Sequence, residues 1–378
     1  MTMNNYCTKS MLQKLRIHLP SGKEFFIMFI STLFSLILVE IALRIWLNNF
    51  STHEEYQKYA LYTDVPPEEY QWSPHHYLNY YPTPNYKKGL TYHNSLGYRN
   101  REFNAEKTKN VYRIVILGGS TTYTIKVEDN ESTFPYQLER ILRESNGNKN
   151  IEVINAGVGG YNSWESLINL QFRVLDIDPD LVIIYHGTND VHTRLVMPEA
   201  YKGDNSGRRK QWKLPRIPPI EHSLLLRVIS RKLGFTSQVG LETNVNASTF
   251  LGTRSAKDRW AELLEKNKPI YFRRNLINMA SIARANEVDI AFATWAHSPY
   301  FNDYASTEAY QSGFRENNEV VKEVADQHGV RLFDFASAMP KDTIYWKDGR
   351  HVNEEGALLK AQLFADYILG SSVLDGRN

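Results

Sequence analysis

Ser120 lies at a position where the chain could expose a catalytic nucleophile. The apolar run 114–117 is too short for a helix and is followed by Gly118, Gly119 and Ser120, which is typical of a buried strand that enters a tight turn. Because glycines have no side chains to crowd the turn, the serine hydroxyl and its backbone N–H can both face a ligand. The segment alone is also compatible with a phosphate-binding turn or a purely structural one, so other segments must decide.

Three further blocks follow in order along the chain. Two come directly after predicted strands and one precedes the last predicted helix: Asn155-Ala-Gly-Val-Gly-Gly-Tyr161, Gly187-Thr-Asn-Asp190 and Asp348-Gly-Arg-His351. Together with the serine block they resemble the SGNH (GDSL-like) hydrolase family, over a stretch from about residue 112 to the C-terminus. The resemblance implies that Ser120 is the nucleophile and that Asp348 and His351 complete a catalytic triad. It also implies that Gly160 and Asn189 are oxyanion-hole donors.

One block departs from the family's eponymous sequence. It reads Gly-Gly-Ser-Thr around the serine, whereas the family form is Gly-Asp-Ser-Leu. The missing Asp is not the triad acid, so the implied chemistry is unchanged. A close relation to the secreted lipase branch is not implied.

A serine hydroxyl becomes an effective nucleophile only when a base takes its proton during attack. His351 is the candidate base because Asp348, three residues earlier, can fix the imidazole tautomer from the same turn. Asn353 can cap the helix that follows. The other histidines near predicted strand ends lack an Asp-x-x-His arrangement: His186, His192 and His297.

Attack on an ester places negative charge on the carbonyl oxygen, which hydrogen-bond donors must stabilise. The expected donors are the backbone N–H groups of Ser120 and Gly160 and the side-chain amide of Asn189, a neutral NH2 donor. The glycines 157–160 lack the spacing of a dinucleotide loop, and Gly187–Asp190 alone could be a simple turn. No His, Cys and acidic residues cluster at metal-ligand spacing, so we expect neither a metal nor a cofactor.

Strand and helix patterns alternate along the C-terminal part of the chain. The strands are expected at 114–117, 151–154, 181–185, 290–295 and 332–335, and the helices at 163–175, 272–286, 308–327 and 354–369, with a further helix that Ser132 or Thr133 can cap. Such alternation predicts an α/β fold with a doubly wound parallel sheet of about five strands. The family resemblance implies the flavodoxin-like strand order. Ligands bind such sheets beyond the carboxyl ends of the strands, where the first three blocks fall.

Residues 25–47 form an apolar run interrupted only by three hydroxyl residues, Glu40 and Arg44. A helix of this length can cross a hydrocarbon core of about 30 Å. Glu40 and Arg44 lie four residues apart and can pair on one helical face. We favour an uncleaved transmembrane anchor over a signal peptide, because no small-x-small cleavage site follows the run. A buried core helix is the third possibility.

The charge distribution around this run predicts its orientation. Four basic residues and one acidic residue lie within the tail 1–24, whereas five acidic residues and one lysine lie between 48 and 69. The basic side is expected in the cytoplasm, which places the rest of the chain outside the membrane. The one cysteine, Cys7, falls on the reducing side, so the outer part has no disulfide to form.

Two segments show little periodicity. Residues 48–110 are rich in Tyr, Pro and Asn and are expected to form a connector whose aromatic side chains pack on the hydrolase domain, 111–372, or else stack on sugars. Residues 191–260 break the strand–helix pattern and are expected to form an insertion that could cap the site. Its basic run 208–219 either meets an anionic lipid or glycan or is a solvated face.

These features together predict a membrane-anchored serine esterase that removes acyl groups, acetyl first, from an envelope glycan or lipid. An O-acyltransferase with the same triad is the second hypothesis, and a glycan-binding module with a vestigial site is the third. A formal net charge of +2 gives no bias towards nucleic acid, which is not expected as a partner.

Overall fold

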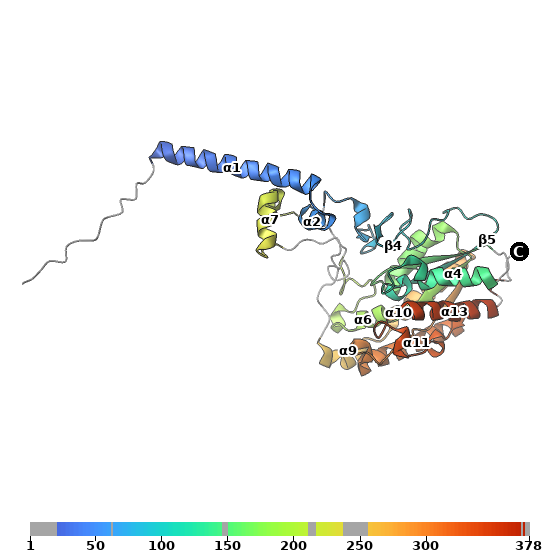
Figure 1. Ribbon diagram of the computed structural model, residues 1–378. Coiled ribbons are helices and arrows are strands. Elements are labelled where there is room, and N and C mark those ends of the chain that lie inside the picture. Colours follow the sequence, from blue (N-terminus) through green and yellow to red (C-terminus); the bar gives the residue numbers. More distant parts are fainter. Residues whose placement is uncertain are drawn as a thin grey trace, which may run out of the picture. The chain divides into compact units, whose positions relative to one another are not determined.

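In the computed structural model the described residues are 21–61, 63–145, 150–210, 217–236, 256–371 and 373–374. The chain divides into two compact units (Figure 1). Residues 1–64 and 216–240 form the N-terminal unit, and residues 65–215 and 241–378 form the large unit. Of the predicted insertion 191–260, residues 216–240 are assigned to the N-terminal unit and the remainder to the large unit.

The large unit is built on a five-stranded sheet. Its strands in chain order are β5 (Val111–Gly118), β6 (Asn150–Gly157), β7 (Leu181–Tyr185), β8 (Asp289–Ala293) and β9 (Arg331–Phe333). All neighbours pair in parallel, in the spatial order β6-β5-β7-β8-β9. The first strand in sequence therefore lies second in the sheet, and the predicted flavodoxin-like order is confirmed.

Helices cover both faces of this sheet. The α-helices among the described residues of the large unit are α3 (Ser120–Tyr123), α4 (Phe134–Ser145), α5 (Ser163–Asn169), α6 (Thr188–Arg194), α9 (Trp260–Lys266), α10 (Ile270–Ala285), α11 (Glu308–His328), α12 (Phe335–Ala338) and α13 (Glu354–Gly370). Ile114 and Ile116 of β5 belong to the core layer shared with α4 and α13. Val115 and Leu117 belong to the opposite layer, shared with α10 and the second half of α11. Strands buried on both faces explain the uninterrupted apolar runs of the sequence.

The structure differs from several predicted boundaries. The helix expected at 163–175 is α5, followed by a π-helical turn at Leu170–Val174 and a 3₁₀ turn at Leu175–Ile177. Strand β8 ends at Ala293 and β9 at Phe333, each two residues before the predicted end. The side-chain periodicity that reveals a helix does not distinguish its hydrogen-bonding pattern, which explains the first difference.

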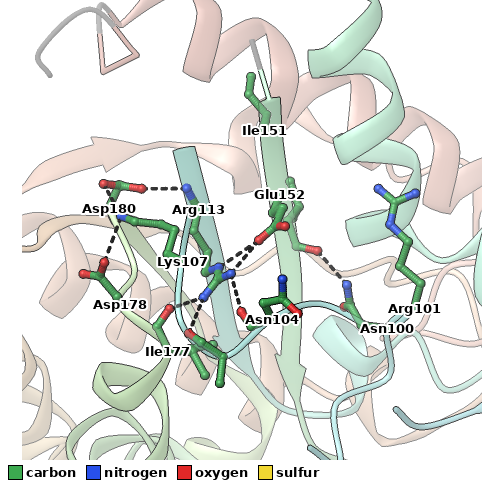
Figure 2. A network of polar contacts seen from close by, with 12 residues as sticks. Asn100, Arg101, Asn104, Lys107, Arg113, Ile151, Glu152, Ile177, Asp178 and Asp180 are labelled. Atoms are coloured by element: carbon green, nitrogen blue, oxygen red, sulfur yellow. Dashed lines mark hydrogen bonds and ion pairs between the residues drawn. The ribbon is translucent and has the colours of Figure 1, made fainter. Parts of the chain in front are cut away.

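A buried polar network links the amino ends of β5, β6 and β7 (Figure 2). The Arg113 guanidinium, at the start of β5, contacts Glu152 on β6 at 2.8 Å and donates to the Asn104 carbonyl at 2.7 Å. The Arg113 backbone N–H donates to Asp180 at 2.7 Å, and Lys107 pairs with the same carboxylate. Since every charge here has a partner, the network is satisfied despite its burial. It joins the 65–110 segment to the end of the sheet opposite the predicted site.

The rest of the 65–110 segment carries two short hairpins and packed aromatic residues. Its strands are β1 (Trp72–Ser73), β2 (Tyr81–Pro82), β3 (Lys87–Lys88) and β4 (Thr91–Tyr92). Leu78 and Tyr80 form a small core with Val158 and Tyr161, against which Trp72 packs. These aromatic side chains pack inside the large unit.

The N-terminal unit contains α1 (Gly22–Asn49), α2 (His53–Tyr59) and α7 (Leu224–Lys232). Ser21 and Glu24 form a capping box that starts α1, because each side chain accepts a backbone N–H of the other residue. Helix α1 is long and apolar enough to cross a membrane, and its most apolar window has no buried residue. A membrane anchor and a signal sequence both have this character. The predicted tail before residue 21 lies outside the described residues.

Candidate active site

The nucleophile candidate sits at the turn between β5 and α3. Strand β5 ends at Gly118, and Ser120 is the first residue of α3. A Cβ on Gly118 would lie 2.1 Å from Thr122 Oγ1, and a Cβ on Gly119 would lie 2.7 Å from Asn189 Nδ2. Both glycines are therefore required for the close packing of this turn, which brings the Asn189 amide next to the serine.

The structure brings Ser120, His351 and Asp348 together. Ser120 Oγ lies 2.8 Å from His351 Nε2, and His351 Nδ1 lies 2.8 and 3.0 Å from the two carboxylate oxygens of Asp348. With Nδ1 protonated and donating to the carboxylate, Nε2 is left to accept the serine proton. This is the arrangement that general-base activation of a hydroxyl requires.

The loop that carries the acid and the base is held at several points. Asp348 Oδ1 accepts the backbone N–H groups of Arg350 and His351, both at 2.9 Å. The Asn353 side chain caps α13 by accepting the Gly356 N–H at 2.9 Å, as predicted. The loop therefore has a fixed geometry just before the first turn of α13.

The four candidate histidines differ in what their rings contact. His186 Nε2 is hydrogen-bonded to Ser166 Oγ at 2.8 Å. The His192 ring lies 5.3 Å from a tyrosine ring, and the His297 ring lies 4.7 Å from a phenylalanine ring. Of these four rings, only that of His351 is hydrogen-bonded to Ser120. The geometry therefore favours His351, the histidine of the Asp-x-x-His pattern, as the base.

Burial affects the pKa values of both His351 and Asp348. Burial lowers the pKa of His351 below its ordinary value, although the hydrogen bond and charge of Asp348 act in the opposite direction. Burial alone would raise the pKa of Asp348, but its contacts with His351 outweigh this effect and the pKa lies below its ordinary value. At neutral pH the pair is therefore a neutral imidazole beside a carboxylate, which is the state a general base needs.

This charge state predicts the pH dependence of turnover. Only neutral His351 can accept the serine proton, and its lowered pKa keeps it neutral at lower pH than an exposed histidine. We therefore expect kcat/KM to rise with pH, to reach half its plateau below about pH 6.5, and to stay flat through neutrality. Asp348→Asn should move this midpoint to still lower pH and reduce the plateau. A wild-type midpoint above pH 7 would contradict the prediction.

The three predicted oxyanion donors follow the carboxyl ends of three neighbouring parallel strands, β6, β5 and β7. Gly160 has a φ of 82°, a left-handed conformation that favours glycine. Asn189 Nδ2 donates to the Tyr161 carbonyl at 2.8 Å, which uses one of its two N–H bonds and leaves the other for a ligand. Within the described part of the chain, the backbone N–H groups of Ser120 and Gly160 donate to no protein acceptor.

Two residues behind this turn were not predicted from the sequence. Tyr80 Oη donates to the Gly159 carbonyl at 2.5 Å, and the Arg209 guanidinium donates to the Gly160 carbonyl. Burial raises the pKa of Tyr80, so its hydroxyl keeps the proton that it donates. In a planar trans peptide the C=O and the N–H point in opposite directions. The hydrogen bond from Tyr80 to the Gly159 carbonyl therefore fixes the direction of the Gly160 N–H, which is the expected donor and points the opposite way.

Arg209 belongs to the basic run that was expected at the surface. Arg208 and Arg209 are only 6% and 5% exposed, so for these two residues both surface interpretations are wrong. Arg209 Nε lies 3.3 Å from the buried carboxylate of Glu165, which also accepts Asn79 Nδ2 at 2.7 Å. A buried acid partner explains why the arginine is inside. Residues 211–216 of the run lie outside the described residues.

The Tyr80 contact predicts a selective effect on catalysis. Tyr80→Phe removes one hydrogen bond to the peptide that carries the Gly160 N–H, and such a bond contributes about 1–1.5 kcal/mol. We expect kcat to fall roughly tenfold with KM little changed. Tyr98→Phe is the matched control because it removes another buried hydroxyl, which donates to the Arg173 carbonyl. Equal losses in both variants would indicate a general effect on stability.

Asp190, the last residue of the third block, has a structural role. It is buried, and its carboxylate accepts both the backbone N–H and the hydroxyl of Ser163, the latter at 2.5 Å. Burial raises the pKa of Asp190 to about 7, against these hydrogen bonds. The contact ties the start of α5 to α6. Among the described residues, no group of three His, Cys, Asp or Glu side chains could hold a metal ion.

Much of this chain matches a known protein family. Residues 116–359 match the GDSL-like Lipase/Acylhydrolase family. No curated protein matches the sequence.

Several solved structures are similar in fold. A lipase/acylhydrolase from Enterococcus faecalis is 20% identical, with 69% of this chain and 96% of that one covered and a TM-score of 0.42. A GDSL-like lipase from Bacteroides thetaiotaomicron is 16% identical, with coverages of 68% and 88% and a TM-score of 0.38. An acetyl xylan esterase from Geobacillus stearothermophilus is 13% identical, with coverages of 70% and 97% and a TM-score of 0.41. The family match covers more than half of the chain, and the chain therefore belongs to the GDSL-like lipase/acylhydrolase family as an ester-hydrolysing enzyme.

Proposed function

We propose that this protein is a membrane-anchored serine esterase that removes acyl groups, acetyl first, from an envelope glycan or lipid. The observation that carries the proposal is the continuous hydrogen-bonded chain from Ser120 Oγ through the His351 ring to Asp348. Ser120 lies at the carboxyl edge of the sheet, where the N–H groups of Ser120 and Gly160 and the Asn189 amide are the expected donors. A nucleophile, a base and donors for a developing negative charge are the requirements of acyl transfer.

In the first half of the reaction, His351 Nε2 takes the proton of Ser120 as Oγ attacks the ester carbonyl carbon. The carbonyl oxygen becomes an oxyanion that the N–H groups of Ser120 and Gly160 and the Asn189 amide stabilise. The intermediate collapses to an acyl-serine, and the alcohol leaves with the proton that His351 returns. Asp348 stays ionised throughout and stabilises the imidazolium.

In the second half, water takes the place of the alcohol. His351 removes a proton from the water, whose oxygen attacks the acyl-serine carbonyl. The second tetrahedral intermediate uses the same donors and then releases the carboxylic acid, and Ser120 regains its proton. The chemistry is thus complete with side chains of this chain and one water molecule.

The anchoring part of the proposal is supported by α1 and by the charges that flank it. The window from Phe25 to Val39 carries no charged residue, and basic residues precede it while acidic ones follow. This asymmetry orients the N-terminus towards the cytoplasm and the hydrolase domain away from it. A reporter fused after residue 378 should therefore be active only if it works outside the cytoplasm. Activity of a reporter that requires the cytoplasm would refute this orientation.

Activity on acyl esters of graded chain length tests the catalytic part. We expect the full-length protein in detergent to release free acid fastest from acetyl esters, and Ser120→Ala to abolish the release. The rate of acid release should not change when an oligosaccharide acceptor is added. If an acylated oligosaccharide accumulates while acid appears only in trace, the enzyme is an acyltransferase. If no ester reacts but a glycan binds to wild type and Ser120→Ala alike, the site is vestigial.

A further inference from the structure

The exposed face of α7 is apolar. Leu226, Ile229 and Leu233 recur at helical spacing on one side, and they are 43%, 45% and 64% exposed. Phe235, just after the helix, is 79% exposed. A surface helix of a water-soluble domain normally turns its polar side outward. The contiguous apolar stripe on α7 therefore needs a covering partner.

The opposite face of α7 holds polar groups. This helix therefore turns its apolar side outward and its polar side inward. Arg227 is 3% exposed, and its guanidinium donates to the carbonyls of Glu221 at 2.7 Å and Tyr59 at 2.6 Å. Arg231 pairs with the Glu221 carboxylate at 2.9 Å. These charges are satisfied inside the N-terminal unit while the aliphatic side chains point away from it. Such an arrangement is stable where the surroundings are apolar.

Helix α7 is attached to α1 through Glu40. The Glu40 carboxylate accepts the backbone N–H groups of Leu224 and Leu225 at 2.9 and 2.8 Å, and the Ser223 hydroxyl at 2.9 Å. A negative charge at a helix N-terminus also interacts favourably with the helix dipole. Arg44 adds a hydrogen bond to the His222 carbonyl at 2.8 Å. The start of α7 is therefore fixed to one turn of α1 (Figure 1).

The position of this attachment along α1 indicates what covers the apolar face of α7. Glu40 is the first charged residue after the charge-free run Phe25–Val39. Helix α7 thus begins beside the last two turns of the apolar run 25–47, which lie near one edge of the hydrocarbon core if α1 spans the membrane. The exposed side chains of α7 and of α1 then need the same apolar surroundings. A bilayer supplies them to both helices.

We propose that α7 lies in the membrane interface, with Leu226, Ile229, Leu233 and Phe235 among the lipid acyl chains. The proposal rests on the proposed membrane anchoring by α1. Short amphipathic helices bind membranes weakly by themselves. Attachment to a membrane-spanning helix keeps α7 next to the bilayer at high effective concentration, so the weak affinity suffices. The segment that the sequence suggested as a cap would then provide a second contact with the membrane.

Site-specific fluorescence tests this placement in the full-length protein. Cys7→Ser removes the single native cysteine, and one new cysteine is introduced by Ile229→Cys or Leu233→Cys and labelled with a polarity-sensitive nitrobenzoxadiazole dye. The labelled proteins are reconstituted into vesicles of phosphatidylcholine and phosphatidylglycerol that contain a spin-labelled lipid quencher. Ile30→Cys on α1 reports anchoring. Leu358→Cys on α13 is the matched control, because Leu358 is 45% exposed like Ile229.

We expect the labels at Ile229 and Leu233 to be quenched by the lipid several-fold more than the label at Leu358, with a blue-shifted emission. If the Ile30 label is quenched but those on α7 respond like Leu358 and remain open to aqueous iodide, the α7 proposal fails and the anchor stands. If the Ile30 label is also unquenched and the protein does not float with the vesicles, both proposals fail. Protection of the α7 labels from lipid quencher and iodide alike would show a protein contact in place of lipid.

Discussion

Ser120→Ala should lower kcat by roughly four orders of magnitude or more, and adding His351→Ala to it should lower kcat little further. The reason is the 2.8 Å contact between Ser120 Oγ and His351 Nε2, which makes the two side chains one proton-transfer unit. Once either member is missing, the other has no partner to act on. Turnover of a short acyl ester by both single variants and the double variant measures this non-additivity.

Two measurements test this prediction. One is the kcat of a matched serine variant, and the other is whether the losses in kcat multiply in the double variant. Ser281→Ala removes a hydroxyl on α10 that only bonds the Ile277 carbonyl of its own helix, and it should leave kcat unchanged. Losses that multiply in the double variant would mean that Ser120 and His351 act independently. That result would contradict the proposed triad even if each single variant were impaired.

Asn189→Ala should lower kcat by about 10²–10³ with a much smaller change in KM. The side chain lies beside the Ser120 turn with one N–H bonded to the Tyr161 carbonyl, which fixes the direction of the other N–H. A donor held in this way interacts most strongly when charge develops on the substrate oxygen, so its loss affects the transition state more than substrate binding. Steady-state kinetics with an acetyl ester separate the two parameters.

Asn318→Ala provides the comparison for this variant. Its side-chain amide also donates to a backbone carbonyl, that of Trp295, at 3.0 Å. Both variants lose one amide-to-carbonyl hydrogen bond, and Asn318→Ala also loses the Trp295 backbone N–H that its Oδ1 accepts at 2.7 Å, so both should lose some thermal stability. If Asn318→Ala reduced kcat as strongly as Asn189→Ala, or if Asn189→Ala raised KM and left kcat unchanged, Asn189 would not be an oxyanion donor.

The strands and the local turns could be predicted because their signals are local. The central strands β5 and β7 are buried on both faces and so appear as short continuous apolar runs, as in Leu181–Tyr185. The glycines before Ser120 and the three-residue spacing from Asp348 to His351 are likewise properties of single turns. Such patterns depend on a few neighbouring residues, and the order of the four blocks then indicated the fold family.

Residues that support the site through long-range contacts could not be predicted. Tyr80 reaches Gly159 across 79 positions, and Arg209 reaches Gly160 across 49. Nothing in the neighbouring sequence indicates that Tyr80, in a Tyr-rich connector, and Arg209, in a basic run, are buried. Their environment is decided by partners such as Glu165, whose position depends on the folding of the whole sheet.

The sequence by itself therefore determined the α/β architecture, the strand order through the family resemblance, and the identity of the residues that could do chemistry. Only the tertiary structure decided that the segment 191–260 is shared between two units, that Arg208 and Arg209 are buried, and that α7 turns its apolar face outward. The physical reason is that burial and hydrogen bonding in these places join distant parts of the chain, as Glu40 does when it accepts the N–H groups that begin α7. Apolar periodicity shows which face of a helix needs a partner, but the identity of that partner depends on the packing of the folded chain.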